Sequence, residues 1–362
     1  MLMSRSIHIS VRAKLILMLL PPILGLAYFS VSQVMSSYNL YWEHDKIQSL
    51  SQSSVQAATL VHELQKERGL TADFIDSQGK EFATQLSVQL SVQRKLVDAE
   101  IEQWDLRVKL NSTQDYGSEF AAGLAKSNRQ LMKLVPTRAK ISNLSINAKD
   151  AFDYFSTLNL NLLNLSEALP KISSESSMGN RAAAYTSFLY SMERAYIESA
   201  LMAGVFVEDN FSTVNYQKFF GLVAMQSTYM NVFQSIATPE ALAFYRNTLA
   251  GEYIAETKKM RNIAINSAKK NSIGVDSTHW VKMQAGKIKL LKNVDDWLAA
   301  DLLRFSAEST EAARSSLITV SVIALIVFML SVLFSYHVQN YMVKYLDYVN
   351  DIATSIAAAS AR

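Results

Sequence analysis

A charged residue interrupts the apolar face of a helix near the start of the chain. The face has the three- and four-residue spacing of an amphipathic helix and consists of Ala57, Leu60, Val61, Leu64, Arg68, Thr71 and Ile75. A guanidinium on a buried face must be paired or must meet an anion, because an uncompensated buried charge costs several kcal/mol. Arg68 is therefore the first candidate for chemistry in this chain.

Two more arginines occupy similar positions in the second half of the chain. Arg194 shares its helix face with Tyr190, Ile197, Leu201 and Val205. Arg181 lies one helical turn before Tyr185 on the same stretch of sequence. Because Tyr185 and Tyr190 are close to these arginines, their hydroxyl groups are candidates to line a polar pocket.

Structural ion pairs are the main alternative to an anion site. Four glutamates lie close to the arginines in sequence: Glu63, Glu67, Glu193 and Glu198. Pairs four residues apart on a helix are common and contribute little to stability. Adjacent residues point in different directions, so Glu67 cannot pair with Arg68 across one helix. Arg68 therefore needs a partner from another helix.

Other kinds of site find no support in the sequence. The chain has 0 cysteines, and its 5 histidines do not occur at metal-ligand spacing. Glycine-rich phosphate loops and serine-based catalytic patterns are absent, and Asp295-Asp296 is interpreted as the solvated face of a helix. We therefore expect no catalysis, metal or cofactor in this chain. A net charge of +3 without a basic run argues against nucleic-acid binding.

The elements that position these residues are predicted to be helices. Only 11 glycines and 5 prolines occur in 362 residues, and strand patterns are nearly absent. The expected helices cover residues 36–76, 79–109, 114–135, 139–169, 180–208, 212–237, 239–270 and 276–313. Pro136 is interpreted as a break, as is Pro170 with the serine-rich run to Gly179, and Thr238 and Asp276 are interpreted as N-terminal caps. The predicted fold is all-α, with two stacked four-helix bundles favoured over one large bundle.

Two apolar segments are long enough to cross a bilayer, at residues 15–35 and 315–336. Basic residues before the first segment place residues 1–14 in the cytoplasm. Residues 36–314 would then lie outside, in the periplasm of a bacterium, and residues 337–362 in the cytoplasm. A cleaved signal peptide is the alternative for the first segment, but no clear cleavage site follows it. Residues 337–362 are too few for an output module, so we expect either a longer receptor or a signalling partner.

The segment from Leu60 to Leu70, LVHELQKERGL, resembles the leucine-Gln-x-Glu-Arg-Gly motif of the NIT domain. This domain is the nitrate- and nitrite-sensing module of bacterial receptors and regulators. Residues 181–195 are similar to the second Glu-Arg element of the family, and residues 280–298 to its closing helix. The resemblance covers about residues 45–305, and the motif Lys66-Glu67-Arg68 also has a weak echo at Met192-Glu193-Arg194.

The resemblance implies two four-helix bundles that bind nitrate or nitrite through arginines between helices. Matched by motif, Arg68 and Arg194 are the expected ligands, followed by Arg181, and Tyr185 is added by its proximity. The chain lacks a Gly-Gln before Glu193-Arg194, which leaves the identity of the anion open. Residues 337–362 resemble the start of a HAMP linker without its early proline, and such linkers feed chemoreceptor, kinase or cyclase domains.

The sequence as a whole predicts a receptor of the bacterial inner membrane. Nitrate or nitrite would bridge Arg68 and Arg194, and a helix shift of about 1–2 Å would cross the membrane to cytoplasmic signalling machinery. A homodimer is expected from the receptor resemblance. The alternatives are a receptor for an amino acid or carboxylate, and a membrane-anchored interaction protein with no small ligand. Any catalytic output domain would lie beyond this chain.

Overall fold

The computed structural model describes residues 11–77, 83–110, 116–267 and 272–360. These residues form helices and turns without any strand, which confirms the all-α prediction. The chain divides into two compact units. One consists of Glu43–Glu308, and the other combines Met1–Trp42 with Ser309–Arg362. The candidate site residues all lie in the unit Glu43–Glu308.

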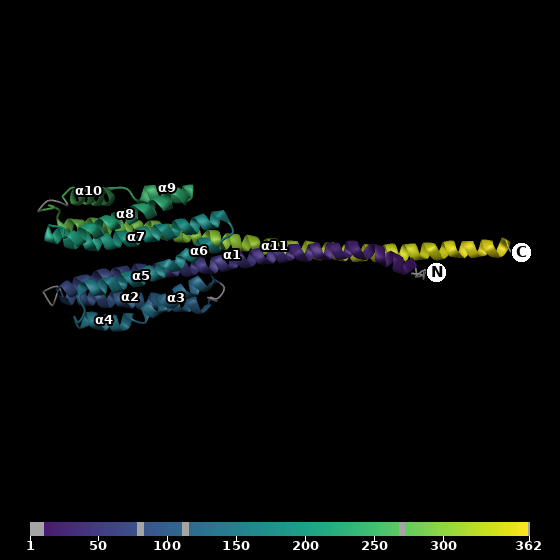
Figure 1. The fold of residues 1–362 in the computed structure, drawn as a ribbon, viewed down its shortest axis with the longest axis horizontal. Helices are drawn as coiled ribbons and strands as arrows, with labels where there is room; N and C mark the ends of the chain where they lie inside the picture. The colour runs from purple at the N-terminus through teal and green to yellow at the C-terminus, as the bar shows by residue number, and fades with distance from the viewer. Residues whose placement is uncertain (1–10, 78–82, 111–115, 268–271, 361–362) are drawn as a thin grey trace, which may run out of the picture. The chain divides into compact units, whose positions relative to one another are not determined.

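Within this unit the helices form two groups (Figure 1). The elements of the first group are α1 (Val11–Ser77), α2 (Ala83–Leu110), α3 (Ser118–Leu131), α4 (Leu134–Ser142) and α5 (Ala148–Leu163). A connection follows through the 3₁₀-helix η2 (Asn164–Ala168) and the short helix α6 (Leu169–Ile172). The elements of the second group are α7 (Ser176–Glu208), α8 (Thr213–Ile236), α9 (Pro239–Thr248), α10 (Glu252–Ser267) and α11 (Ser277–Ser360).

Each group has four helical positions, because two short helices share the third position: α3 with α4, and α9 with α10. The two groups contact each other along α1 and α7, where His62 Nδ1 lies 3.1 Å from the Tyr196 hydroxyl and Gln65 donates to Glu193. One hydrophobic core cluster contains residues of both groups. The two groups therefore pack against each other along α1 and α7 and share part of one core.

Local backbone chemistry explains where the structure departs from the expected helix boundaries. The expected helix 139–169 is interrupted, because α4 ends at Ser142 and the Asn147 side chain caps α5 by accepting from the Asp150 N–H. The expected helix 239–270 is divided by Gly251, whose φ of 92° suits glycine. Pro136 is not a break, because it lies near the start of α4, where a missing N–H is tolerated. The predicted break from Pro170 to Gly179 is present, because α6 ends at Ile172 and α7 begins at Ser176.

Both predicted caps are confirmed. Thr238 Oγ1 accepts from the Ala241 N–H at 3.2 Å, and Asp276 Oδ1 accepts from the His279 N–H at 2.5 Å. These bonds satisfy backbone donors that a helix start leaves without partners. The beginnings of α9 and α11 are thus determined locally, by the residue type at each cap.

Two helices in the described part of the chain, α1 and α11, are long and apolar enough to cross a membrane. This is a statement about their length and composition. The apolar windows lie in the unit formed by residues 1–42 and 309–362, and no residue of either window is buried inside the protein.

Candidate functional site

Arg68 is buried at the contact between the two groups of helices, with an exposure of 2%. Its Nη1 donates to Glu193 Oε1 of α7 at 2.6 Å and to Ser156 Oγ of α5 at 2.9 Å. Nη2 lies 3.4 Å from Glu193 Oε2, and the guanidinium covers the ring of Phe152 at 4.7 Å. The prediction that Arg68 needs a partner from another helix is thus correct, and that partner is a glutamate.

Glu193 is fully buried and holds a second donor from α1. Gln65 Nε2 donates to its Oε2 at 2.6 Å. Among the residues that the structure describes, Gln65 Oε1 has no hydrogen-bond partner, and neither does any side-chain polar atom of the fully buried Asn159 on α5. Asn159 follows Ser156 by three residues, so the two share a helix face. The surroundings of the Arg68–Glu193 pair therefore keep unused hydrogen-bonding capacity.

Each helix group also contains a buried glutamate that pairs with an arginine from a short helix of the same group. Glu67 of α1 accepts from Nε and Nη2 of Arg138 on α4, both at 2.7 Å. Glu198 of α7 accepts from Nε of Arg261 on α10 at 2.6 Å and from the Nη2 of the same guanidinium. The structural counterpart of Glu67 is therefore Glu198, although the sequence echo suggested Glu193. Arg138 and Arg261 lie on short helices whose patterns single out neither residue.

Arg194 is partly buried and differs from the other predicted arginines. It forms no ion pair with another residue of the described segments, and its guanidinium lies 6.0 Å from the ring centroid of Tyr229. Tyr190 stacks on the same ring at 5.0 Å, and its hydroxyl lies 2.6 Å from Asn164 Oδ1 and from Glu167 Oε1. Burial, followed by Glu167, raises the pKa of Tyr190. Arg194 thus carries a charge for which an anion would be a partner.

Arg181 and Tyr185 interact with α11 instead. Arg181 pairs with Asp301 and covers the ring of Phe305 at 4.4 Å. Tyr185 is 1% exposed, and burial and then Asp295 raise the pKa of its hydroxyl. Arg181 precedes Arg194 by thirteen residues, which is roughly 20 Å along a helix. The structure therefore places Arg68 beside Glu193 and does not bring all four predicted residues together.

Asp295 corrects one expectation from the sequence. It is 2% exposed, so it does not belong to a solvated face, whereas its neighbour Asp296 is exposed. Burial raises the pKa of Asp295, and Lys292, whose Nζ lies 2.9 Å from Oδ2, opposes that change. The expectation failed because the Asp295 side chain faces Tyr185 inside the helix group, a contact that spacing along α11 does not indicate.

A cavity of about 510 Å³ lies next to Arg68. Phe152 and Ser156, the two α5 residues that contact the guanidinium, are part of its wall. Ile197, three residues after Arg194, lies in the wall on α7, and Lys149 and Lys218 lie there as well. The cavity thus offers space for a ligand close to one predicted arginine and one helical turn from another.

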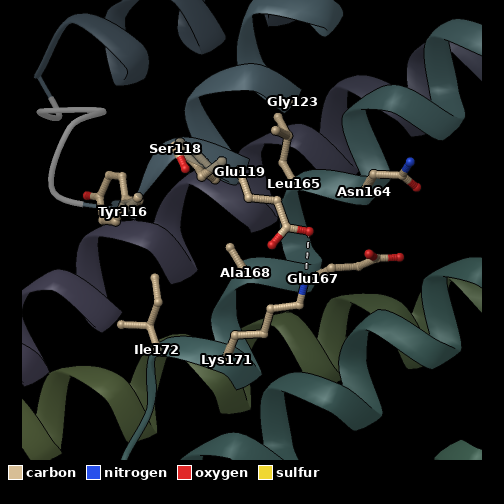
Figure 2. Close-up of a pocket in the computed structure, with 12 residues that line it drawn as sticks. Tyr116, Ser118, Glu119, Gly123, Asn164, Leu165, Glu167, Ala168, Lys171 and Ile172 are labelled. Carbon is tan, nitrogen blue, oxygen red and sulfur yellow. Dashed lines mark hydrogen bonds and ion pairs between the residues drawn. The ribbon is translucent and has the colours of Figure 1, made fainter.

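A second cavity, of about 280 Å³, lies between α3 and the η2–α6 connection (Figure 2). Figure 2 shows Lys171 reaching Glu119, and their ion pair measures 2.8 Å. Glu167 is also part of its wall. None of the described residues in its wall is an arginine, and its lysine is already paired. Its charges therefore suit an anion less well than those near Arg68.

Comparison with known proteins identifies the family. The family model for nitrate and nitrite sensing, NIT, matches residues 59–303. The chain belongs to the NIT family. The match includes Arg68, Arg181, Tyr185 and Arg194, and it confirms the resemblance seen in the motif around Arg68. This protein therefore carries a nitrate- and nitrite-sensing domain.

Two relatives show how far the similarity of this NIT protein extends. A nitrate regulatory protein from Klebsiella oxytoca is 25% identical over 249 residues, which are 68% of this chain and 61% of the relative. The chain thus spans less than two thirds of that relative's length. The structure of the NasR transcription antiterminator matches with a TM-score of 0.68 and 22% identity, covering 87% of this chain and 86% of that one. This second match shows a shared fold.

Proposed function

We propose that this protein is a membrane-bound receptor in which nitrate or nitrite binds at Arg68 and Arg194. The observation that carries the proposal is the buried Arg68–Glu193 pair inside the NIT region. The carboxylate of Glu193 contacts the Arg68 guanidinium through both of its oxygens. Nitrate is also planar and can present two oxygens to a guanidinium in the same way. Glu193 therefore holds the position that the anion would take.

Competition between the ligand and Glu193 would move helices. Nitrate bridging Arg68 and Arg194 would release Glu193, whose buried carboxylate would then lack its cation. An unpaired buried charge costs several kcal/mol, so α7 and its carboxylate must be displaced relative to α1. Binding energy would thus become a change in the contact between the two helix groups.

The displacement has a route towards the membrane along α11. This helix contacts α7 through the Arg181–Asp301 pair and through Trp280, whose Nε1 donates to the Ser199 carbonyl at 3.0 Å. It continues without interruption to Ser360 and contains one of the apolar windows. A shift of about 1–2 Å and a coupling free energy of ~1–3 kcal/mol are ordinary for such switches.

The proposed topology keeps residues 1–14 and 337–362 in the cytoplasm and residues 36–314 in the periplasm. Support comes from the two apolar windows and from the basic residues that precede the first one. The protein would work in the bacterial inner membrane as a homodimer and would act on cytoplasmic signalling machinery. This reading places it among sensors rather than enzymes.

The test is thermal unfolding of the full chain in detergent micelles with nitrate, nitrite, chloride or sulfate at millimolar concentration. A ligand at ~100 times its Kd stabilises the folded state by about 2.7 kcal/mol. We expect selective stabilisation by nitrate or nitrite, which Arg68→Lys abolishes because an ammonium lacks the paired donors. The matched control Arg138→Lys alters an arginine outside the proposed site and should keep the response. Equal shifts with all four anions, or none, would contradict the proposal.

A receptor for an organic carboxylate is a second candidate, favoured by the cavity. At about 510 Å³ it is much larger than nitrate needs, and its walls are mainly apolar. A carboxylate could reach Arg68 while its apolar part fills the cavity. Asp153 in the wall, which pairs with Lys149 at 2.8 Å, could receive an amino group in place of that lysine. The same unfolding assay with amino acids and aromatic carboxylates distinguishes the two: stabilisation by these compounds but not by nitrate would favour the second candidate.

A further inference from the structure

The outer face of α2 carries a stripe of exposed residues that are apolar except for one glutamine. The inner face packs into the core through Leu90, Val97 and Trp104. On the opposite side, exposed residues follow at spacings of three and four, namely Val88, Val92, Leu96, Ala99, Gln103, Leu106 and Leu110. The five large apolar members are 47–77% exposed. Isolated exposed apolar residues are normal, but a contiguous stripe marks an interaction surface.

Neither α1 nor α4 covers this stripe. α1 contacts α2 through hydrogen bonds from Gln56 to Glu100 and from Arg107 to Gln52. α4 contacts α2 through the ion pair of Arg138 with Asp98. The stripe lies between these two contacts and spans 22 residue steps, which is about 33 Å at 1.5 Å per residue. Its length suits another helix.

Charged residues beside the stripe indicate that the partner helix is α2 of a second copy of this chain. Lys95 and Glu102 lie on one side, and Glu100 and Arg107 on the other. None of the four forms an ion pair with another residue of the described segments, and the bonds to Gln56 and Gln52 hold Glu100 and Arg107 in place. In a parallel pair of helices, a charged residue on one side of the stripe faces a residue of the second helix. That partner lies five positions later in the sequence and on the other side of the stripe. Lys95 then meets Glu100 of a second copy, and Glu102 meets its Arg107.

We propose that α2 is the homodimer interface, pairing in parallel with α2 of a second copy of this chain. The two-fold symmetry of a dimer repeats both ion pairs, so four opposite-charge contacts flank the apolar stripe. The parallel direction rests on the proposed membrane anchoring of both copies, and the cross-linking pattern tests it. An antiparallel pair would instead place Lys95 opposite Glu102 of the second copy.

Disulfide cross-linking in membranes tests the interface directly. The chain has 0 cysteines, so single-cysteine variants need no background changes. We expect Leu106→Cys and Val92→Cys to form covalent dimers several-fold more efficiently than Asp105→Cys, an exposed neighbour on another face. Equal cross-linking of Leu106→Cys and Asp105→Cys would overturn the interface. Cross-linking only when Val92→Cys and Leu106→Cys chains are mixed would overturn the parallel orientation.

Charge reversal tests the flanking pairs in the Leu106→Cys background. Lys95→Glu should reduce cross-linking several-fold, and Glu100→Lys in the same chain should restore it. Restoration by Glu102→Lys instead would indicate an antiparallel pair, and restoration by neither would overturn the pairing. The nitrate response is measured by thermal unfolding of the same variants, so failure of the interface and failure of nitrate binding are separate results.

Discussion

Glu193 and Arg68 form a fully buried ion pair between α7 and α1, with 2.6 Å between Oε1 and Nη1. Glu193 lies near the middle of α7 and Arg68 lies in the last third of α1, so the pair helps to fix how the two groups of helices meet. Buried pairs of this kind contribute little net stability, but removing one partner is costly. A contact with these properties is suited to a switch, because an anion that takes the place of Glu193 leaves its buried carboxylate unpaired, and that cost favours a change in how the helices meet.

Glu193→Gln should make the protein less stable without anion and more responsive to nitrate. The substitution leaves the Arg68 charge buried without a counter-charge, which costs about 3–5 kcal/mol. Nitrate restores that charge balance and no longer competes with a carboxylate. We therefore expect a lower unfolding temperature without nitrate and a larger nitrate-induced increase than in the wild type. A nitrate shift no larger than that of the wild type would contradict competition at this site.

Replacing both partners by apolar residues separates stability from ligand binding. Arg68→Met with Glu193→Leu removes both buried charges at once, and such exchanges are often neutral or stabilising by ~1–4 kcal/mol. The double variant should unfold at or above the wild-type temperature and should not respond to nitrate. A retained nitrate response in this folded variant would place the anion elsewhere in the protein.

Much of the local structure could be predicted from the sequence. The caps at Thr238 and Asp276 depend on residue type at one position, and the structure contains both. Helix-face spacing also indicated that Arg68 is buried. Because adjacent side chains on a helix point in different directions, the sequence also predicted correctly that the partner of Arg68 lies on another helix. These inferences succeed because each depends on residues a few positions apart.

The remaining features of the site depend on how helices meet, which spacing along one helix does not determine. Predicting Glu193 as the partner of Arg68 would have required knowledge of the register between α1 and α7. Arg138 and Arg261 were missed because they lie on short helices, and their carboxylate partners are on other helices. Asp295 was misjudged for the same reason, since Tyr185 of α7 faces it.

The Glu198–Arg261 pair should be structural and independent of the ligand. Glu198 is fully buried, and it also accepts from Gln226 Nε2 at 2.7 Å. Arg261→Met removes its guanidinium and should lower the free energy of unfolding by about 3–5 kcal/mol. The nitrate-induced shift should remain, because Arg68 and Arg194 are unchanged. Chemical denaturation with and without nitrate measures both quantities, and loss of selectivity for nitrate would assign Arg261 to the ligand site.

His62 should make the folded protein less stable in acid. Burial lowers its pKa from 6.5 to about 4, with Lys66 and Lys292 adding to the effect. In the unfolded chain His62 binds a proton below about pH 6.5, whereas in the folded chain it does so only below about pH 4. The free energy of unfolding therefore falls as the pH decreases between these two values. The loss amounts to about 2–3 kcal/mol by pH 4.

The difference between the wild type and His62→Gln isolates this contribution, because glutamine can still accept from the Tyr196 hydroxyl and does not titrate. Asp295 changes the stability in the opposite direction, because its raised pKa makes the folded state bind a proton at a higher pH than the unfolded state does. This contribution is the same in the wild type and in His62→Gln. We expect the two stability curves to separate progressively between pH 6.5 and pH 4, with the wild type falling more steeply. Parallel curves across that range would mean that His62 is protonated as easily in the folded state as in the unfolded state.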